Sequence, residues 1–184
     1  MTHKGTVTIE TERLILRRFR LDDAQDMFRN WASSENVTRF LTWPPHASVE
    51  VSRGYIQYII DSYADNRYNW MIEHKALHEA IGCIDVISIR EDIACCEIGY
   101  CLSDRFWGEG YMPEAFQAVI RFLFEEVGMN RIQATHDLNN PKSGRVMEKC
   151  GLRYEGTLRQ GSRNNQGICD SVMRAILRED YDKQ

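Results

Sequence analysis

A glycine-containing turn between a predicted strand and a predicted helix is the feature that most limits how this chain can fold. Cys95–Leu102 is a β-prone run, and Pro113–Val127 repeats apolar residues at helical spacing. Gly108 and Gly110 stand between them and permit a tight turn whose backbone can approach a ligand closely. The first N–H groups of a helix lack internal partners, and the helix dipole adds partial positive charge there. This strand, turn and helix therefore predict an α/β unit with a candidate anion site.

The same turn lacks two widespread phosphate-binding motifs. A Walker A loop needs Lys and then Ser or Thr after its second glycine, and Tyr111 and Met112 occupy those positions. A dinucleotide-binding fingerprint needs a third small residue where Pro113 stands. A plain glycine-rich turn is the alternative to a phosphate cradle.

The composition fits a globular chain with no general attraction for polyanions. Its 184 residues suit one domain, predicted to span residues 1–184 with a core over about residues 11–178, because no repeat or linker divides it. Lys and Arg total 23 against 27 Asp and Glu, and this net charge of −4 argues against nucleic acid or an anionic membrane as partner. An anionic ligand must therefore be held by a local site.

Cysteine usage and hydropathy predict a cytoplasmic protein. The first ten residues carry no apolar run of the signal-peptide type, and no segment approaches the roughly 18 apolar residues of a membrane helix. None of the six cysteines belongs to a C-x-x-C pair, so reduced thiols are expected. His74 and His78 have the spacing of a helical metal pair but fall in a predicted strand connection, so no metal site is expected.

Strand and helix patterns alternate along the chain. Strands are predicted over residues 12–19, 68–73, 81–89, 95–102, 131–137, 154–159 and 171–178, and helices are predicted to begin near Asp22, Ser48, Pro113 and Pro141. This order predicts a mixed α/β sheet with helices on its faces.

The extended glycine motif resembles that of the GNAT family of N-acetyltransferases. Arg105-x-x-Gly108-x-Gly110 matches the family signature Q/R-x-x-G-x-G/A. Further along, residues 140–143 (NPKS) and 148–152 (EKCGL) are similar to the N-x-x-S…E-K-x-G-F segment of the RimJ/RimL branch. That branch acetylates protein N-termini, including those of ribosomal proteins. The opening TERLILRRF also looks like this branch.

The resemblance implies a fold, a co-substrate and a set of binding residues. The fold is a single, mostly antiparallel sheet of about seven strands, with flanking helices and a splay between strands 4 and 5. Acetyl-CoA binds at the splay as co-substrate, without a metal. By position, backbone near Cys101 and Leu102 would hold the pantetheine, and Asn140 would reach it from the other side. The pyrophosphate would be held by Arg105, Phe106, Trp107, Gly108, Glu109, Gly110 and Tyr111.

Glu97 and Ser143 are the candidate catalytic residues. Period-2 alternation places Glu97 on one strand face, beside the implied splay, where a carboxylate would take the amine proton directly or through water. A structurally paired glutamate is the alternative. Ser143 matches the position where the branch places a hydroxyl near the CoA sulfur, to stabilise the departing thiolate. Capping of the helix is its alternative role.

The chain departs from the family at two catalytic positions. Met147 stands where many members carry a tyrosine acid, and residues 159–163 lack the glutamate of some RimL-like enzymes. The base assignment is therefore open, and His136 is a second candidate that is otherwise a strand-face residue.

The connection between the first two helices is expected to border the acceptor groove. Phe40, Trp43 and His46 are the substrate-side candidates, with Arg163 and Asp170 of the last hairpin opposite them. The resemblance favours a protein or peptide N-terminal α-amine as acceptor. A small amine, such as a polyamine or an antibiotic, and a non-catalytic CoA-binding module are the alternatives. A monomer or a homodimer is expected.

Overall fold

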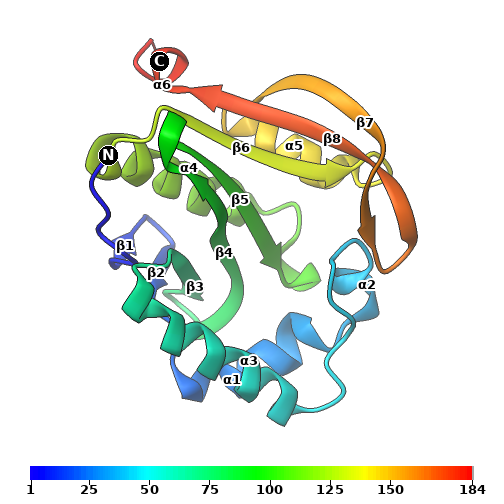
Figure 1. Cartoon of the computed structure of the whole chain (residues 1–184). Coiled ribbons are helices and arrows are strands. Elements are labelled where there is room, and N and C mark those ends of the chain that lie inside the picture. Colours follow the sequence, from blue (N-terminus) through cyan, green and yellow to red (C-terminus); the bar gives the residue numbers. More distant parts are fainter. Residues whose placement is uncertain (184) are drawn as a thin grey trace.

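The computed structural model describes residues 1–183 and contains one eight-stranded sheet with flanking helices (Figure 1). The sheet order is β1-β2-β3-β4-β5-β6-β8-β7. The strands are β1 (Ile9–Glu10), β2 (Leu14–Arg17), β3 (Asn69–His74), β4 (Glu79–Arg90), β5 (Cys95–Leu102), β6 (Arg131–Asp137), β7 (Arg153–Asn164) and β8 (Gly167–Leu177). The helices are α1 (Ala24–Met27), α2 (Glu35–Thr38), α3 (Val49–Ser62), α4 (Tyr111–Phe122), α5 (Pro141–Lys149) and α6 (Arg178–Tyr181). The predicted mixed, mostly antiparallel α/β sheet is confirmed, and the two-residue β1 adds an edge strand.

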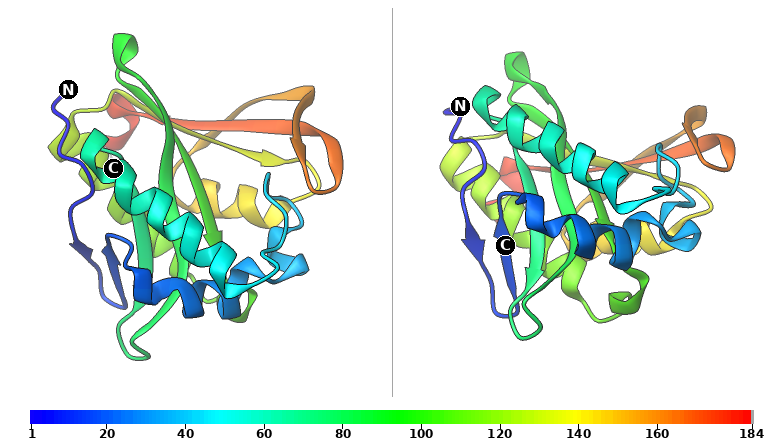
Figure 2. Two further views of the ribbon diagram at one scale, coloured as in Figure 1. Left: turned by 60° about the horizontal axis from the view of Figure 1, so that its bottom comes forward. Right: turned by 90° about the horizontal axis from the view of Figure 1, so that it is seen from below.

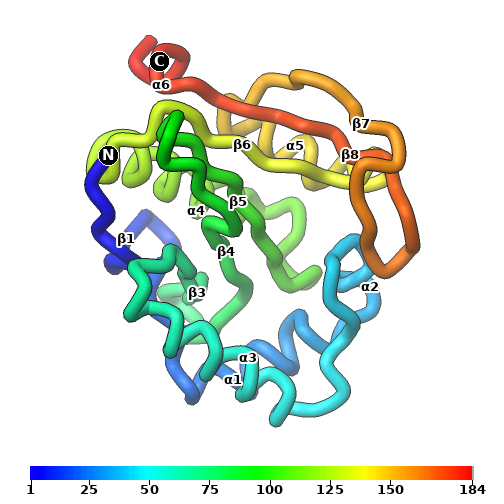
Figure 3. Tube along the Cα trace, viewed as in Figure 1, coloured from blue at the N-terminus to red at the C-terminus, as the bar shows by residue number. Residues whose placement is uncertain are grey.

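Strands β5 and β6 pair over only part of their length, and Figure 3 shows the two chain segments diverging. Their pairing, the one parallel pairing within residues 1–183, joins residues 95–97 to residues 131–133. Beyond Glu97 the strands separate, although β5 stays paired with β4 as far as Leu102. These are the fourth and fifth predicted strands, so the expected splay is present. The free edge of β5 leaves backbone N–H and C=O groups without strand partners, and an extended ligand can pair with them.

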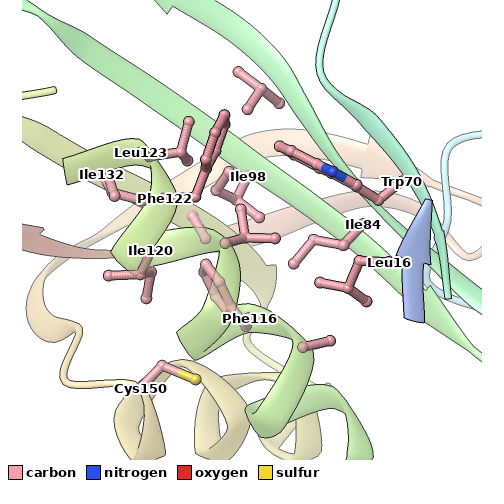
Figure 4. Close-up of a cluster of buried hydrophobic side chains, with 14 of the residues drawn as sticks. Leu16, Trp70, Ile84, Ile98, Phe116, Ile120, Phe122, Leu123, Ile132 and Cys150 are labelled. Atoms are coloured by element: carbon pink, nitrogen blue, oxygen red, sulfur yellow. The ribbon is translucent and has the colours of Figure 1, made fainter. Parts of the chain in front are cut away.

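Apolar clusters pack on both faces of the sheet, and helices cover each (Figure 2). The cluster under α4 and α5 is drawn in Figure 4 and includes Trp70, Ile84, Ile98, Phe116, Ile120 and Ile132. The cluster under α1 and α3 includes Met27, Trp31, Ile56, Met71, Cys83 and Cys101. Because Ile98 and Cys101 fall in different clusters, β5 presents alternate residues to opposite faces, as its sequence predicts.

Several element boundaries differ from the sequence prediction, and two of these differences bear on the site. Helix α4 begins at Tyr111 rather than Pro113, because Gly110 adopts a left-handed conformation (φ +83°) immediately before it. The last hairpin is also longer than predicted. After a register shift between Leu158 and Ser162, β7 and β8 resume pairing up to the turn. This extension brings the hairpin tip toward the segment that follows α2.

Candidate functional site

A cleft of about 970 Å³ opens where β5 and β6 separate. Residues 98–102 of β5 form one wall, and loop residues 106–108 and 110–113 continue it. Helix α5 contributes a second wall, while residues 39–43 and the β7–β8 hairpin border the far end. Small-molecule sites commonly measure roughly 300–1,000 Å³, so this cleft has room for a long ligand.

The glycine loop has the backbone geometry of an anion cradle. Gly108 and Gly110 have φ values of +86° and +83°, a region that glycine enters without steric penalty. The N–H groups of Tyr111 and Met112 belong to the first turn of α4, where no internal acceptor is available. A Cβ built on Gly108 would meet no atom of the described residues within 4 Å. The loop therefore presents open space and free donors, which fit a pyrophosphate.

Two of the predicted loop residues, Arg105 and Glu109, are not brought to the cleft. Arg105 Nη1 lies 3.1 Å from Glu79 Oε1 and 3.3 Å from Asn30 Oδ1, and the Glu109 carbonyl accepts from Arg13 Nη1 at 3.0 Å. Burial raises the pKa of Glu79, but hydrogen bonds from Asn30 and Arg105 outweigh it and leave that pKa lowered. Arg105 therefore anchors the loop to β4 through Glu79, and through Asn30 to the helical segment Phe28–Ala32 that follows α1.

Helix α5 supplies cations that the sequence prediction missed. Lys142, Arg145 and Lys149 line the cleft, and Lys142 Nζ lies 4.9 Å from the centroid of the Trp107 ring. Their spacing of three and four residues puts them on one helix face. The sequence could have indicated this face once a helix was predicted over these residues. They supply the local positive charge that the net charge of −4 does not.

Ser143 and Tyr100 form a hydroxyl pair in the cleft. Asn140 caps α5, because its Oδ1 accepts from the Ser143 N–H at 3.4 Å. The capping role therefore falls to Asn140 rather than to the serine side chain. Ser143 Oγ lies 2.9 Å from Tyr100 Oη, which is also 2.9 Å from the Ser143 carbonyl oxygen. Burial raises the pKa of Tyr100, so its phenol remains protonated and can donate.

Glu97 lies where the β5–β6 pairing ends, and the cleft wall begins at the next residue, Ile98. Its carboxylate accepts from Gln133 Nε2 at 3.4 Å and from Thr135 Oγ1 at 3.3 Å. His136, the second candidate, does line the cleft. Its Nδ1 lies 2.8 Å from the Asp137 carbonyl oxygen, and burial lowers its pKa. The assignment of Glu97 as base stays a prediction.

The predicted acceptor residues divide into two groups. Phe40 and Trp43 line the cleft, whereas His46 packs behind Trp43 with a ring-centroid distance of 5.1 Å. Nδ1 of His46 lies 2.8 Å from Ser52 Oγ, and burial lowers the pKa of the imidazole. Asn165, at the hairpin tip, donates from Nδ2 to the Trp43 carbonyl at 2.8 Å. This hydrogen bond holds the β7–β8 hairpin against the segment that contains Phe40 and Trp43.

Asp85 is a cleft-lining carboxylate that the sequence prediction did not select. It lies on β4 directly opposite Gly99 of β5, and its Oδ1 accepts from Asn69 Nδ2 at 3.0 Å. Burial raises the pKa of Asp85 to about 7, against a smaller lowering by Asn69. The signal available in the sequence was a single acidic residue inside the apolar run of residues 81–87.

Neither a metal-binding cluster nor a membrane-crossing helix is found among residues 1–183. No cluster of three or more His, Cys, Asp or Glu side chains is arranged to bind a metal ion. His74 instead places Nε2 2.9 Å from Tyr111 Oη, and His78 sits in the turn after β3. Within the same residues, no helix combines the length and apolar character needed to cross a bilayer.

Comparison with known proteins supports a common architecture. The family model described as an acetyltransferase (GNAT) domain matches residues 13–153. The uncharacterized N-acetyltransferase p20 of Bacillus licheniformis is 31% identical over 175 residues, 95% of this chain and 98% of that protein. A crystal structure of a GNAT-family acetyltransferase from Bacillus anthracis superimposes with a TM-score of 0.83 at 26% identity, covering 94% of this chain and 99% of that one.

A more distant similarity covers half of the chain. The [ribosomal protein uS5]-alanine N-acetyltransferase of Escherichia coli is 27% identical over 93 residues, 50% of this chain and 48% of that enzyme.

Proposed function

The chain belongs to the GNAT family of acetyltransferases and is an acetyl-CoA-dependent N-acetyltransferase, and on that premise we propose that its acceptor is a protein or peptide N-terminal α-amine. The observation that carries this proposal is the far end of the cleft. There, Trp43 and the β7–β8 hairpin are fastened by Asn165 into a groove that extends beyond the splay. The partial similarity to the uS5-alanine enzyme makes N-termini of the ribosomal-protein type, and hence a RimJ/RimL-like role, the first class to test.

The charges that line the acceptor end distinguish among amines. Arg39 and Arg163 line the cleft there, and two carboxylates, Asp85 and Asp137, also line the cleft. A polyamine carries several positive charges and would meet like charges at the entrance. A peptide N-terminus brings one amine, followed by backbone groups that suit a polar rim. This arrangement favours the peptide over the polyamine.

The donor side fits acetyl-CoA, which supplies the thioester acetyl group when bound. The glycine loop offers free N–H groups, α5 offers three cations, and β5 offers an unpaired edge. In our proposal, Gly108, Gly110 and Tyr111 hold the pyrophosphate with help from Lys142 and Arg145. Backbone near Cys101 and Leu102 pairs with the pantetheine, and Asn140, Phe106 and Trp107 flank it.

A panel of amine acceptors tests the acceptor class. The purified chain is incubated with acetyl-CoA and peptides with free N-terminal Ala or Ser, and thiol release is followed. The same peptides with blocked N-termini and an internal lysine, spermidine and an aminoglycoside form the other arms. We expect release with the free N-termini, and mass spectrometry should place the acetyl group on the α-nitrogen. Release only with the small amines would refute the peptide proposal, and CoA binding without any release would instead support a binding module.

Ser143→Ala should lower kcat while leaving CoA affinity within about twofold. In the proposed role the hydroxyl stabilises the departing thiolate, and loss of one donor to a developing charge costs on the order of 10²- to 10³-fold in kcat. Tyr100→Phe should lower kcat by a smaller factor, because it removes the partner that orients Ser143. Steady-state kinetics with calorimetric CoA titration separates the two effects. A Ser143→Ala enzyme with unchanged kcat would remove the serine from the mechanism.

A cytoplasmic location and a monomeric or homodimeric state stay predictions. All six cysteines are free thiols in the structure.

A further inference from the structure

Asp85 sits on the central strand β4 at the level where the cleft begins. Across β4 and β5 it faces Gly99, and across β3 and β4 it faces Asn69. Gly99 is the second residue of β5 beyond the last pair with β6, and both Gly99 and Asp85 line the cleft. Gly99 has no side chain, and a Cβ built there would meet only Ile87 of β4, at 3.1 Å, and no atom of Asp85 within 4 Å.

The ionisable groups nearest to Asp85 are tyrosine hydroxyls and cysteine thiols that carry no charge near pH 7. Tyr55 of α3 lines the cleft with it, as do the thiols of Cys83 on β4 and Cys101 on β5. Tyr63, just after α3, also faces this region, and its Oη donates to the Asn69 carbonyl at 2.9 Å. Burial raises the pKa of each of these four groups, so all remain neutral near pH 7.

A carboxyl group with a pKa of about 7 is suited to proton transfer at neutral pH. Its pKa is raised because the charged form is desolvated, and hydrogen bonds from Asn69 and Cys83 compensate only in part. Glu97 differs in position. It pairs with Ser88 beyond a bulge, and its oxygens accept from Gln133 and Thr135.

We propose that Asp85 is the general base that accepts the proton of the acceptor amine. The amine nitrogen uses its lone pair to form the N–C bond with the acetyl carbon, and the C–S bonding pair leaves on sulfur. The nitrogen proton passes to Asp85, directly or through one water molecule. Asp85 then releases this proton to solvent, and the sulfur takes one from solvent, so an amide and a thiol are the net products. This inference rests on the acetyltransferase reaction and holds for any amine that the enzyme accepts.

The test compares Asp85→Asn with Glu97→Gln, using whichever amine of the panel the wild type accepts. Asp85→Asn should lower kcat by about 10²- to 10⁴-fold, the usual worth of a general base, with CoA affinity within about twofold. Asp61→Asn, which changes an exposed carboxylate of α3 that does not line the cleft, should retain kcat within about threefold. For the wild type, kcat/KM should rise with pH through an inflection near 7, and Asp85→Asn should lose that inflection. A fully active Asp85→Asn enzyme, or loss of the inflection in Glu97→Gln, would overturn the assignment.

Two measurements hold even if no acceptor is found. The ¹³C carboxyl resonance that disappears in Asp85→Asn should titrate near pH 7 in the wild type, and a midpoint near 4 would refute the proposal. Asn69→Ala should move that midpoint upward, because it removes a hydrogen bond to the charged form. His46 packs against Tyr55 with its ring tilted, and burial lowers its pKa, away from this range.

Thermal unfolding checks that Asp85→Asn folds. A carboxyl whose pKa is raised by folding favours the native state below its unfolded pKa, and this contribution is lost as pH rises toward 7. The neutral asparagine avoids that loss. Asp85→Asn should therefore have a higher Tm than the wild type at pH 8 and a similar Tm at pH 4, and equal shifts at both pH values would contradict a carboxyl whose pKa is raised by folding.

Discussion

Replacement of Gly110 by valine should weaken CoA binding by about 10- to 100-fold, because a side chain at this backbone conformation costs roughly 1–3 kcal/mol. Gly110 has a φ of +83° and directly precedes α4. Valine would pull this φ toward negative values and turn the first N–H groups of α4 away from the cleft. A Cβ at this position meets only Arg13 Nη2, at 3.5 Å, so the effect comes from the backbone and not from a clash. Calorimetric titration with CoA measures it.

Gly128→Val is the matched control for Gly110→Val. Gly128 has nearly the same φ, +82°, but it ends the helical segment that follows α4. Its Cβ would approach Met1 Cα at an ordinary 3.6 Å. Both variants carry the same strain and should lose similar stability, while only Gly110→Val should lose CoA affinity. Equal CoA affinity in the two variants would contradict the cradle assignment.

The sequence predicted the individual strands, turns and helices better than the place where strands β5 and β6 separate. The strand, glycine turn and helix around Gly110 follow from backbone rules acting within a few residues, and the structure has them. Alternation along β5 was equally local, which is why Ile98 and Cys101 fall in opposite clusters as expected. The splay, by contrast, depends on where β6 stops pairing, and only the family resemblance indicated it.

Site residues were missed where partners come from distant segments. Arg105 matched the signature, yet Glu79 and Asn30 engage its guanidinium away from the cleft. Asp85 looked like one more strand residue, because nothing in its own strand shows that β5 separates from β6 beside it and opens a cleft there. Where such a side chain lies depends on how whole strands and helices pack together. The spacing of residues within one strand does not determine that packing.

Arg17→Met should lower the free energy of unfolding by about 3–5 kcal/mol, the usual cost of removing one partner from a buried ion pair. Arg17 is 7% exposed on β2 and bonds two carboxylates. Its Nη1 and Nη2 donate to both oxygens of Asp23, at 2.9 and 2.7 Å, and its Nε donates to Glu73. Burial alone would lower the pKa of Arg17, but these carboxylates outweigh burial and the pKa is raised. Methionine fills similar space but leaves two negative charges without their counterion.

This triad also holds α1, a helix that contributes to the lining of the cleft. Asp23 accepts from the Arg20 N–H at 2.7 Å and immediately precedes α1, whose Met27 lines the cleft. Arg90→Met is the control, because the Arg90–Asp92 pair is exposed and should contribute less than about 1 kcal/mol. Chemical denaturation of both variants gives the two free energies. CoA affinity should survive in Arg17→Met, because the glycine loop and α5 lie outside the triad. The free energies of unfolding of Arg17→Met and Arg90→Met could instead be equal. The carboxylates of Asp23 and Glu73 would then be solvated in Arg17→Met, and the ion pairs would not hold α1 to the sheet.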